Sequence, residues 1–240
     1  EQWREVSGSH FDSRNIFGIY HVRDLRERPT TARTEYIRAC AELRLSPLPV
    51  FDHLQALGSP PSGADPDSHA WENGRRPAFS LDLRSYGLGS KRSIALAAFL
   101  RTFRGAELRS LNIEGCGVPD SALGAVIDAV KKEHGLASLD ISGNPVRSEK
   151  TGNSIAGESL KKQPTSLTNL QLRGCNLSLA ATVALLPRMQ DRLARIETLC
   201  IARNGLGGGG AGEALAGLID GNNSLTDLDL SDNHLGGEQA

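Results

Sequence analysis

The sequence predicts an α/β solenoid in which short strands and helices alternate along the chain. The pattern L-x-x-L-x-L-x-x-(N/C)-x-L recurs from about residue 79 onward, and its Asn/Cys position returns every 28 to 31 residues. An apolar stripe with helical spacing follows the complete copies. Because one such unit can bury its apolar side only against the next unit, this period requires a stack of layers.

The predicted repeats occupy residues 78–240, and we expect about six of them. The first copy is degenerate, because Tyr86 stands at its Asn/Cys position. The remaining copies span residues 108–118, 136–146, 167–177, 196–206 and 225–235. The sequence ends where the other copies enter their helix, so we expect the last repeat to be truncated and further repeats to follow.

The helical half of each repeat is visible as an apolar stripe. In the second copy, Asp120 or Ser121 is predicted to cap a helix with the stripe Leu123, Val126, Ile127 and Val130. In the fifth copy, the predicted stripe is Ala211, Ala214, Leu215, Leu218 and Ile219.

The segments before the repeats are predicted to be a tail, a cap and a loop. Residues 1–30 carry no repeat, and we expect them to be disordered or extended along a partner. Residues 31–58 are predicted to be a helical cap, in which Thr34 caps a helix with the stripe Tyr36, Ala39, Cys40 and Leu43. A second short helix is expected around Val50–Leu57. Residues 59–77 are predicted to form a polar loop, and we expect its Trp71 either to pack on the solenoid or to contact a partner.

Composition argues against several classes of function. The net charge of −1, without a long basic run, gives no reason to expect nucleic-acid binding. No stretch approaches the about 20 apolar residues of a membrane span. The four cysteines and six histidines lack metal-ligand spacing, so we predict buried thiols and no metal. No nucleophile, base and orienting residue can be assembled from the sequence, so we predict no enzyme activity.

One motif resembles a nucleotide-binding loop but has a simpler explanation. Residues 205–210 match G-x-G-x-x-G, follow a predicted strand and precede a predicted helix. The same turn, however, recurs after Tyr86 and Asn233, at the matching position of other repeats. We interpret it as the ordinary repeat turn and predict no cofactor.

The best candidate for a binding surface is the side of the strands opposite the leucines. In each strand the residues between the leucines are expected to face the concave side of the solenoid. The candidate protein-binding residues there are Asp82, Arg84, Asn112, Glu114, Asp140, Gln171, Arg173, Asp227 and Asp229. Five acids against two arginines predict a mildly acidic surface for a basic or polar partner. The alternative is that these are ordinary solvent-facing strand residues.

The strand and full helix within 28 to 31 residues closely resemble the ribonuclease-inhibitor-like class of leucine-rich repeats. That resemblance implies a leucine-rich-repeat horseshoe, a fold that usually binds proteins. The segment from Tyr36 to Pro49, with Cys40, is similar to the cap of certain ciliary leucine-rich-repeat proteins, including dynein-regulatory-complex subunits.

The ciliary resemblance implies a non-catalytic scaffold in the axoneme of a cilium or flagellum. Its expected partners are axonemal subunits or microtubule-associated proteins, and its expected location is the cytoplasmic cytoskeleton. A second possibility is a GTPase-activating regulator, because activators of the Ran GTPase have similar repeats; Arg84 would then supply a charge to the GTPase. A third is the adaptor arm of a signalling or ubiquitin-ligase protein.

Overall fold

The computed structural model describes residues 32–48, 78–84, 86–102, 107–131, 135–159, 167–190 and 195–235. Within these ranges one parallel sheet has the strand order β1-β2-β3-β4-β5-β6, so each strand pairs with its neighbour in the sequence. The strands are β1 (Ala78–Asp82), β2 (Glu107–Asn112), β3 (Ser138–Asp140), β4 (Asn169–Gln171), β5 (Thr198–Cys200) and β6 (Asp227–Asp229).

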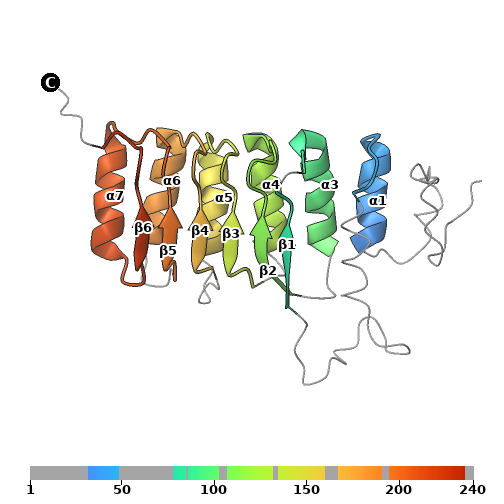
Figure 1. Cartoon of the computed structure of the whole chain (residues 1–240), viewed down its shortest axis with the longest axis horizontal. Helices are drawn as coiled ribbons and strands as arrows, with labels where there is room; N and C mark the ends of the chain where they lie inside the picture. Colours follow the sequence, from blue (N-terminus) through green and yellow to red (C-terminus); the bar gives the residue numbers. More distant parts are fainter. Residues whose placement is uncertain are drawn as a thin grey trace, which may run out of the picture.

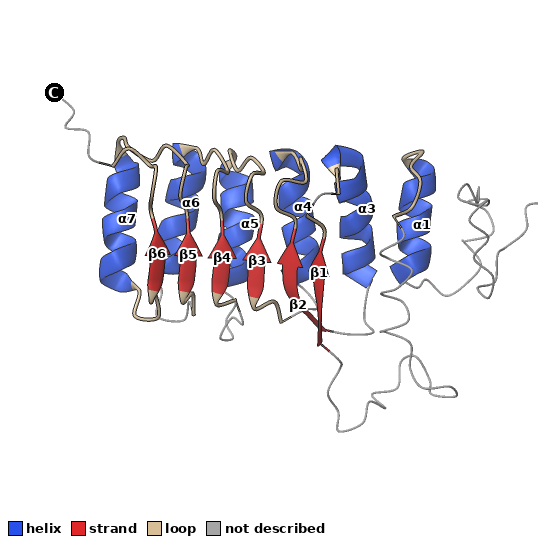
Figure 2. Ribbon diagram, viewed as in Figure 1, coloured by secondary structure: helices blue, strands red, loops and turns tan. Residues whose placement is uncertain are grey.

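A helix follows each of the first five strands, and these helices cover one face of the sheet (Figures 1 and 2). They are α3 (Gly89–Thr102), α4 (Asp120–Lys131), α5 (Glu149–Ser159), α6 (Leu179–Met189) and α7 (Gly210–Gly221). The predicted alternation of parallel strands and helices is therefore confirmed. The other face of the sheet carries no helix among the described residues, and we call it the open face.

The strands pair so that equivalent repeat positions lie side by side. The central leucines of β2 to β6 are direct partners across the sheet, from Leu111 through to Leu228. The residues beside them, from Ser110 to Asp227, are aligned in the same way. Each position of the sequence motif therefore becomes a row of side chains that crosses the sheet.

The leucine rows form the core between sheet and helices. Leu81, Leu111, Leu139, Leu170 and Leu199 are all at most 2% exposed. Removing one leucine side chain of this kind from water contributes about 1.5–3 kcal/mol. The small aliphatic residues that dominate the composition thus match the narrow space of a single strand–helix layer.

A row of asparagines and cysteines closes the turn after the strands. The fully buried Asn144 donates from Nδ2 to the carbonyls of Ile113 (2.8 Å) and Ile141 (3.0 Å), and its Oδ1 accepts the Val118 N–H at 2.8 Å. It therefore links its own layer to the preceding one. This satisfies backbone groups that water cannot reach.

The cysteines at the same position make fewer bonds of this kind. Cys116 donates from Sγ to the carbonyl of Leu83 at 2.9 Å, and Cys175 donates to the carbonyl of Ile141 at 3.4 Å. Burial raises the pKa of the Cys116 thiol to about 11 and that of Cys175 to about 12. Both therefore remain neutral thiols at physiological pH, and their burial confirms the prediction of buried thiols at these two positions.

Before the sheet, α1 (Ala32–Glu42) packs against α3. The Tyr36 ring meets Phe99 edge to face, with centroids 6.3 Å apart, and its hydroxyl accepts the Leu48 N–H at 2.9 Å. The prediction that Thr34 caps this helix is wrong, because the helix starts at Ala32 and Thr34 lies within its first turn. The predicted tail, second cap helix and polar loop with Trp71 lie outside the described residues.

Two details of the predicted helices are also wrong. Asp120 is the first residue of α4 rather than its cap, and its carboxylate accepts the N–H groups of Arg147 and Ser148 in the next layer. Those bonds outweigh burial and lower the pKa of Asp120. The other error concerns Ile219, which was predicted in the buried stripe of α7 but is 55% exposed.

Glycine allows one pair of helices to approach closely. A Cβ added to Gly152 of α5 would lie 2.7 Å from the carbonyl oxygen of Ala181 in α6. Backbone cannot move aside as a flexible side chain can, so α5 and α6 require glycine at this position. In contrast, a Cβ on Gly212 of α7 would meet no atom within 4 Å.

Candidate functional site: the open face of the sheet

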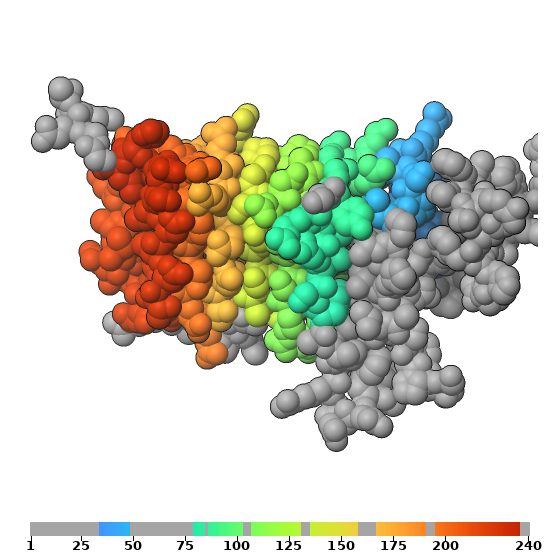
Figure 3. Space-filling model, in the orientation of Figure 1, coloured from blue at the N-terminus to red at the C-terminus, as the bar shows by residue number. Residues whose placement is uncertain are grey.

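Eight of the nine predicted binding residues lie at the carboxyl end of a strand or two residues beyond it, and the ninth, Asp227, is the first residue of β6. None of them is buried: Asp82, Arg84, Glu114 and Asp227 are exposed, and the other five are half-buried. In Figure 3 the layers stand side by side across this broad face. The strand register therefore brings together residues that are far apart in the sequence.

Three other residues that lie between the leucines of the motif are not accessible on the open face. Ser142, Cys200 and Ala202 are buried. Ser142 accepts the Arg173 N–H on its hydroxyl at 3.1 Å, and the Cys200 thiol lies 3.4 Å from Asp229 Oδ2. Neighbouring longer side chains can cover such small ones. The accessible part of the face therefore depends on its longer polar side chains.

Two ion pairs lie on this surface. At the first strand, Arg84 binds Asp82 through Nε (3.0 Å) and Nη2 (2.7 Å). The hydrogen bond from Arg84 lowers the pKa of Asp82, and the same partner raises the pKa of Arg84, with Glu114 and Asp140 adding to the effect. Farther along, Arg173 Nη1 lies 3.5 Å from Asp229 Oδ2, so this pair reaches from β4 to β6 across β5.

Four of the predicted binding residues also have a local structural role. Asp82, Asn112, Asp140 and Asp229 each accept, on a side-chain oxygen, the backbone N–H two residues later, at 2.9 or 3.0 Å. This contact starts the turn that leaves each of these four strands. The sequence signal for this structural role is an Asp or Asn at the same position of four repeats. The sequence analysis interpreted these residues as binding residues.

A shallow depression lies at the first strands of the open face. Asp82, Arg84, Glu114 and Gly115 line it. Two carboxylates and one paired guanidinium give it an acidic character. Its open shape suits the contact of a protein surface better than the enclosure of a small molecule, because small-molecule sites bury most of their ligand.

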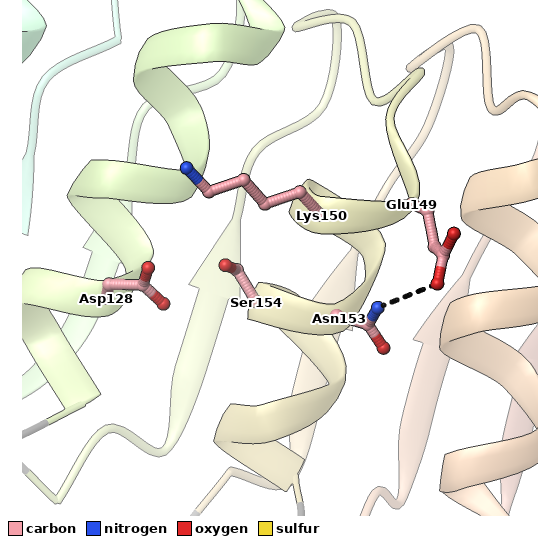
Figure 4. Close-up of a pocket in the computed structure, with 5 residues that line it drawn as sticks. All are labelled: Asp128, Glu149, Lys150, Asn153 and Ser154. Atoms are coloured by element: carbon pink, nitrogen blue, oxygen red, sulfur yellow. Dashed lines mark hydrogen bonds between the residues drawn. The ribbon is translucent and has the colours of Figure 1, made fainter.

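A second depression lies on the helical side, between α4 and α5 (Figure 4). Lys150 extends toward α4, and Ser154 points toward Asp128, while Glu149 pairs with Asn153 at 3.5 Å. This mixture of charges on one open groove presents no activated nucleophile. We therefore treat the open face as the stronger candidate.

The described residues give little support for a metal, nucleotide or membrane site. In the described ranges, no three His, Cys, Asp or Glu residues are grouped so that they could hold a metal ion. The glycine run at residues 205–210 serves layer packing, since the carbonyl of His234 leaves no room for a side chain on Gly207. No described helix is both long and apolar enough to cross a membrane.

One comparison with known proteins agrees with the repeat geometry. The family model described as Leucine Rich repeat matches residues 221–238, which include β6 and its turn. This match supports a leucine-rich-repeat protein. Among the curated proteins, nothing matches the chain. Leucine-rich repeats are typically non-catalytic modules that bind other proteins, so the match suggests a protein-interaction scaffold.

Proposed function

We propose that this chain is a non-catalytic protein-binding scaffold, a horseshoe that holds its partner on the open face of the sheet. The observation that supports this most strongly is the alignment of nine polar residues on the one sheet face that no described helix covers. In this proposal residues 78–240 are the repeats, and residues 31–58, which include α1, cap their first layer. A cap is needed because an uncovered terminal layer exposes its apolar side.

The charges of the open face define the partner that fits it. Its five acids are Asp82, Glu114, Asp140, Asp227 and Asp229, and the two arginines of the face are each already paired with one of them. Glu114, Asp140 and Asp227 are therefore left to attract a partner with a basic or polar ridge. Charges of this kind mainly raise the rate of encounter and the specificity.

We further propose that the scaffold is a structural subunit of a ciliary or flagellar axonemal complex. This part rests on the resemblance of the segment from Tyr36 to Pro49 to the caps of ciliary leucine-rich-repeat proteins. The burial of Tyr36 and Cys40 against the first layer is compatible with a cap role for this segment. Axonemal subunits or microtubule-associated proteins would then be the partners.

The pairing of Arg84 places a small energetic cost on the GTPase-activating alternative. A charge supplied to a GTPase must be free to reach the transferred phosphate. Arg84 Nε and Nη2 are instead both held by Asp82. Using Arg84 in this way would first require that ion pair to break.

Cross-linking mass spectrometry on the protein purified with its native complex tests the proposal. We expect cross-links from the repeats to tubulin or axonemal subunits. The partner found in this way should bind Asp140→Asn and Glu114→Gln more slowly than the unchanged chain. A matched control, Glu213→Gln on the exposed side of α7, should not change the rate. Cross-links to a small GTPase, with hydrolysis accelerated by the chain and lost in Arg84→Ala, would contradict the scaffold.

A further inference from the structure

The depression between α4 and α5, which we call the α4–α5 groove, lies on the side of α5 that is packed less closely. Gly152 lets α5 approach the backbone of α6, because it has no Cβ to meet the Ala181 carbonyl oxygen. In contrast, α5 makes fewer contacts with α4 than with α6. The groove opens at this looser junction, far from the open face (Figure 4).

Ser154 places a hydroxyl group in the floor of the α4–α5 groove. The residue is only 6% exposed, yet the described part of the chain gives its Oγ no hydrogen-bond partner. Its side chain lines the groove and points toward α4 in Figure 4. Buried hydroxyl groups normally have a hydrogen-bond partner, because one without a partner costs free energy. The Ser154 hydroxyl is therefore suited to bind a polar group that enters the groove.

Gly124 of α4 leaves space beside this hydroxyl. A Cβ added to Gly124 would lie 3.6 Å from Ser154 Oγ and 3.5 Å from Thr151 Oγ1, which is ordinary van der Waals contact. Packing therefore does not require glycine here, unlike at Gly152. Alanine is also the better residue for the interior of a helix. What the glycine does provide is access to the Ser154 hydroxyl from the α4 side.

The two walls of the groove carry opposite charges. Lys150 of α5 extends toward α4, and Asp128 of α4 lies opposite Ser154 (Figure 4). The Lys150 ammonium can only donate hydrogen bonds, and the Asp128 carboxylate can only accept them. Because a carboxylate has about four lone-pair sites, Asp128 can accept a further bond beside those it already accepts.

A group that fits this arrangement must accept on one side and donate on the other. A carboxamide does both, because its carbonyl oxygen accepts and its NH2 group donates. A carboxylate would suit Lys150 but would be repelled by Asp128. An ammonium group would suit Asp128 but would be repelled by Lys150. A neutral, dipolar group is therefore the best match for both walls.

We propose that the α4–α5 groove is a second binding site, which takes the carboxamide of an asparagine or glutamine side chain from a partner protein. The carbonyl oxygen of that side chain accepts from the Ser154 hydroxyl and the Lys150 ammonium, and its nitrogen donates to Asp128. The site lies on the helical side of the sheet. It is therefore independent of the open-face function, and one chain can use both.

Propionamide, which reproduces the end of a glutamine side chain, tests the proposal in NMR titrations of the 240-residue chain. We expect saturable shifts of the Gly124 and Ser154 amide signals. Propionate and propylammonium are charged molecules of similar size and serve as matched controls. Each should bind about two- to tenfold more weakly than propionamide, because it loses at least one hydrogen bond and meets a like charge.

Two variants of the groove and one control complete the experiment. Ser154→Ala removes the hydroxyl and Gly124→Ala covers it, so both should weaken propionamide binding about two- to tenfold. Gly212→Ala in α7, where a Cβ would meet no atom within 4 Å, should leave binding unchanged. Propionamide that shifts neither signal, or that binds Gly124→Ala as tightly as the unchanged chain, would overturn the proposal. Equal binding of propionate would do the same, because the site would then not select a carboxamide.

Discussion

Replacement of Asn144 by alanine is the sharpest test of how the layers are held together. The side chain is fully buried and makes three short hydrogen bonds, two donated by Nδ2 and one accepted by Oδ1. A hydrogen bond contributes about 0.5–1.5 kcal/mol, and each buried group left without a partner adds a further penalty. We therefore expect Asn144→Ala to lower the free energy of unfolding by about 3–5 kcal/mol.

The chain provides its own matched control for this substitution. Cysteine occupies the equivalent position in the layers before and after Asn144, and there its thiol donates to a backbone carbonyl. Asn144→Cys should therefore retain one donated bond and lose clearly less stability than Asn144→Ala.

Urea denaturation of both variants measures the two losses, and hydrogen exchange adds a local readout. The Val118 N–H loses its acceptor in both variants, so its exchange should accelerate. A loss below about 1 kcal/mol for Asn144→Ala would refute this reasoning, because it would mean that water or a backbone shift replaces the missing bonds.

Three further predictions concern packing, pH and surface charge. Gly152→Ala should strongly destabilise the chain in urea denaturation, because the added Cβ would meet the Ala181 carbonyl. The control Gly212→Ala should instead stabilise α7 by up to about 1 kcal/mol. Equal effects of the two substitutions would contradict the close approach of α5 and α6. Burial raises the pKa of Cys175 from 9.0 to about 12, so the folded chain binds more protons than the unfolded chain between these values. The free energy of unfolding of the unchanged chain should therefore fall as the pH rises above about 9. It should fall more steeply than that of the Cys175→Ala variant. Equal slopes for the two proteins would show that the Cys175 thiol is not the cause. Arg84→Ala should leave the thermal midpoint unchanged, because exposed ion pairs contribute little to stability, and a clear drop would assign the pair a structural role.

The repeat positions could be predicted from the sequence because the same physical requirement recurs in every layer. A leucine that must be buried in one layer must be buried in the next, so the rows from Leu111 to Leu228 follow from the spacing alone. The open-face residues followed from the alternation of side chains along a strand.

Features that depend on a single junction could not be predicted in this way. Helical spacing placed Ile219 in the buried stripe, but its exposure depends on what lies beyond the last described strand. Asp120 was expected to cap its own helix, yet its carboxylate is aimed at the next layer. The pairing of Arg173 with Asp229 joins residues two layers apart, and no local pattern in the sequence indicates such a contact.

The pairing of each strand only with its sequence neighbours also bears on how the chain folds. Every junction closes a loop of roughly one repeat, so no junction must wait for distant segments to meet. Folding can therefore begin at any pair of layers and spread outward, as in other linear arrays.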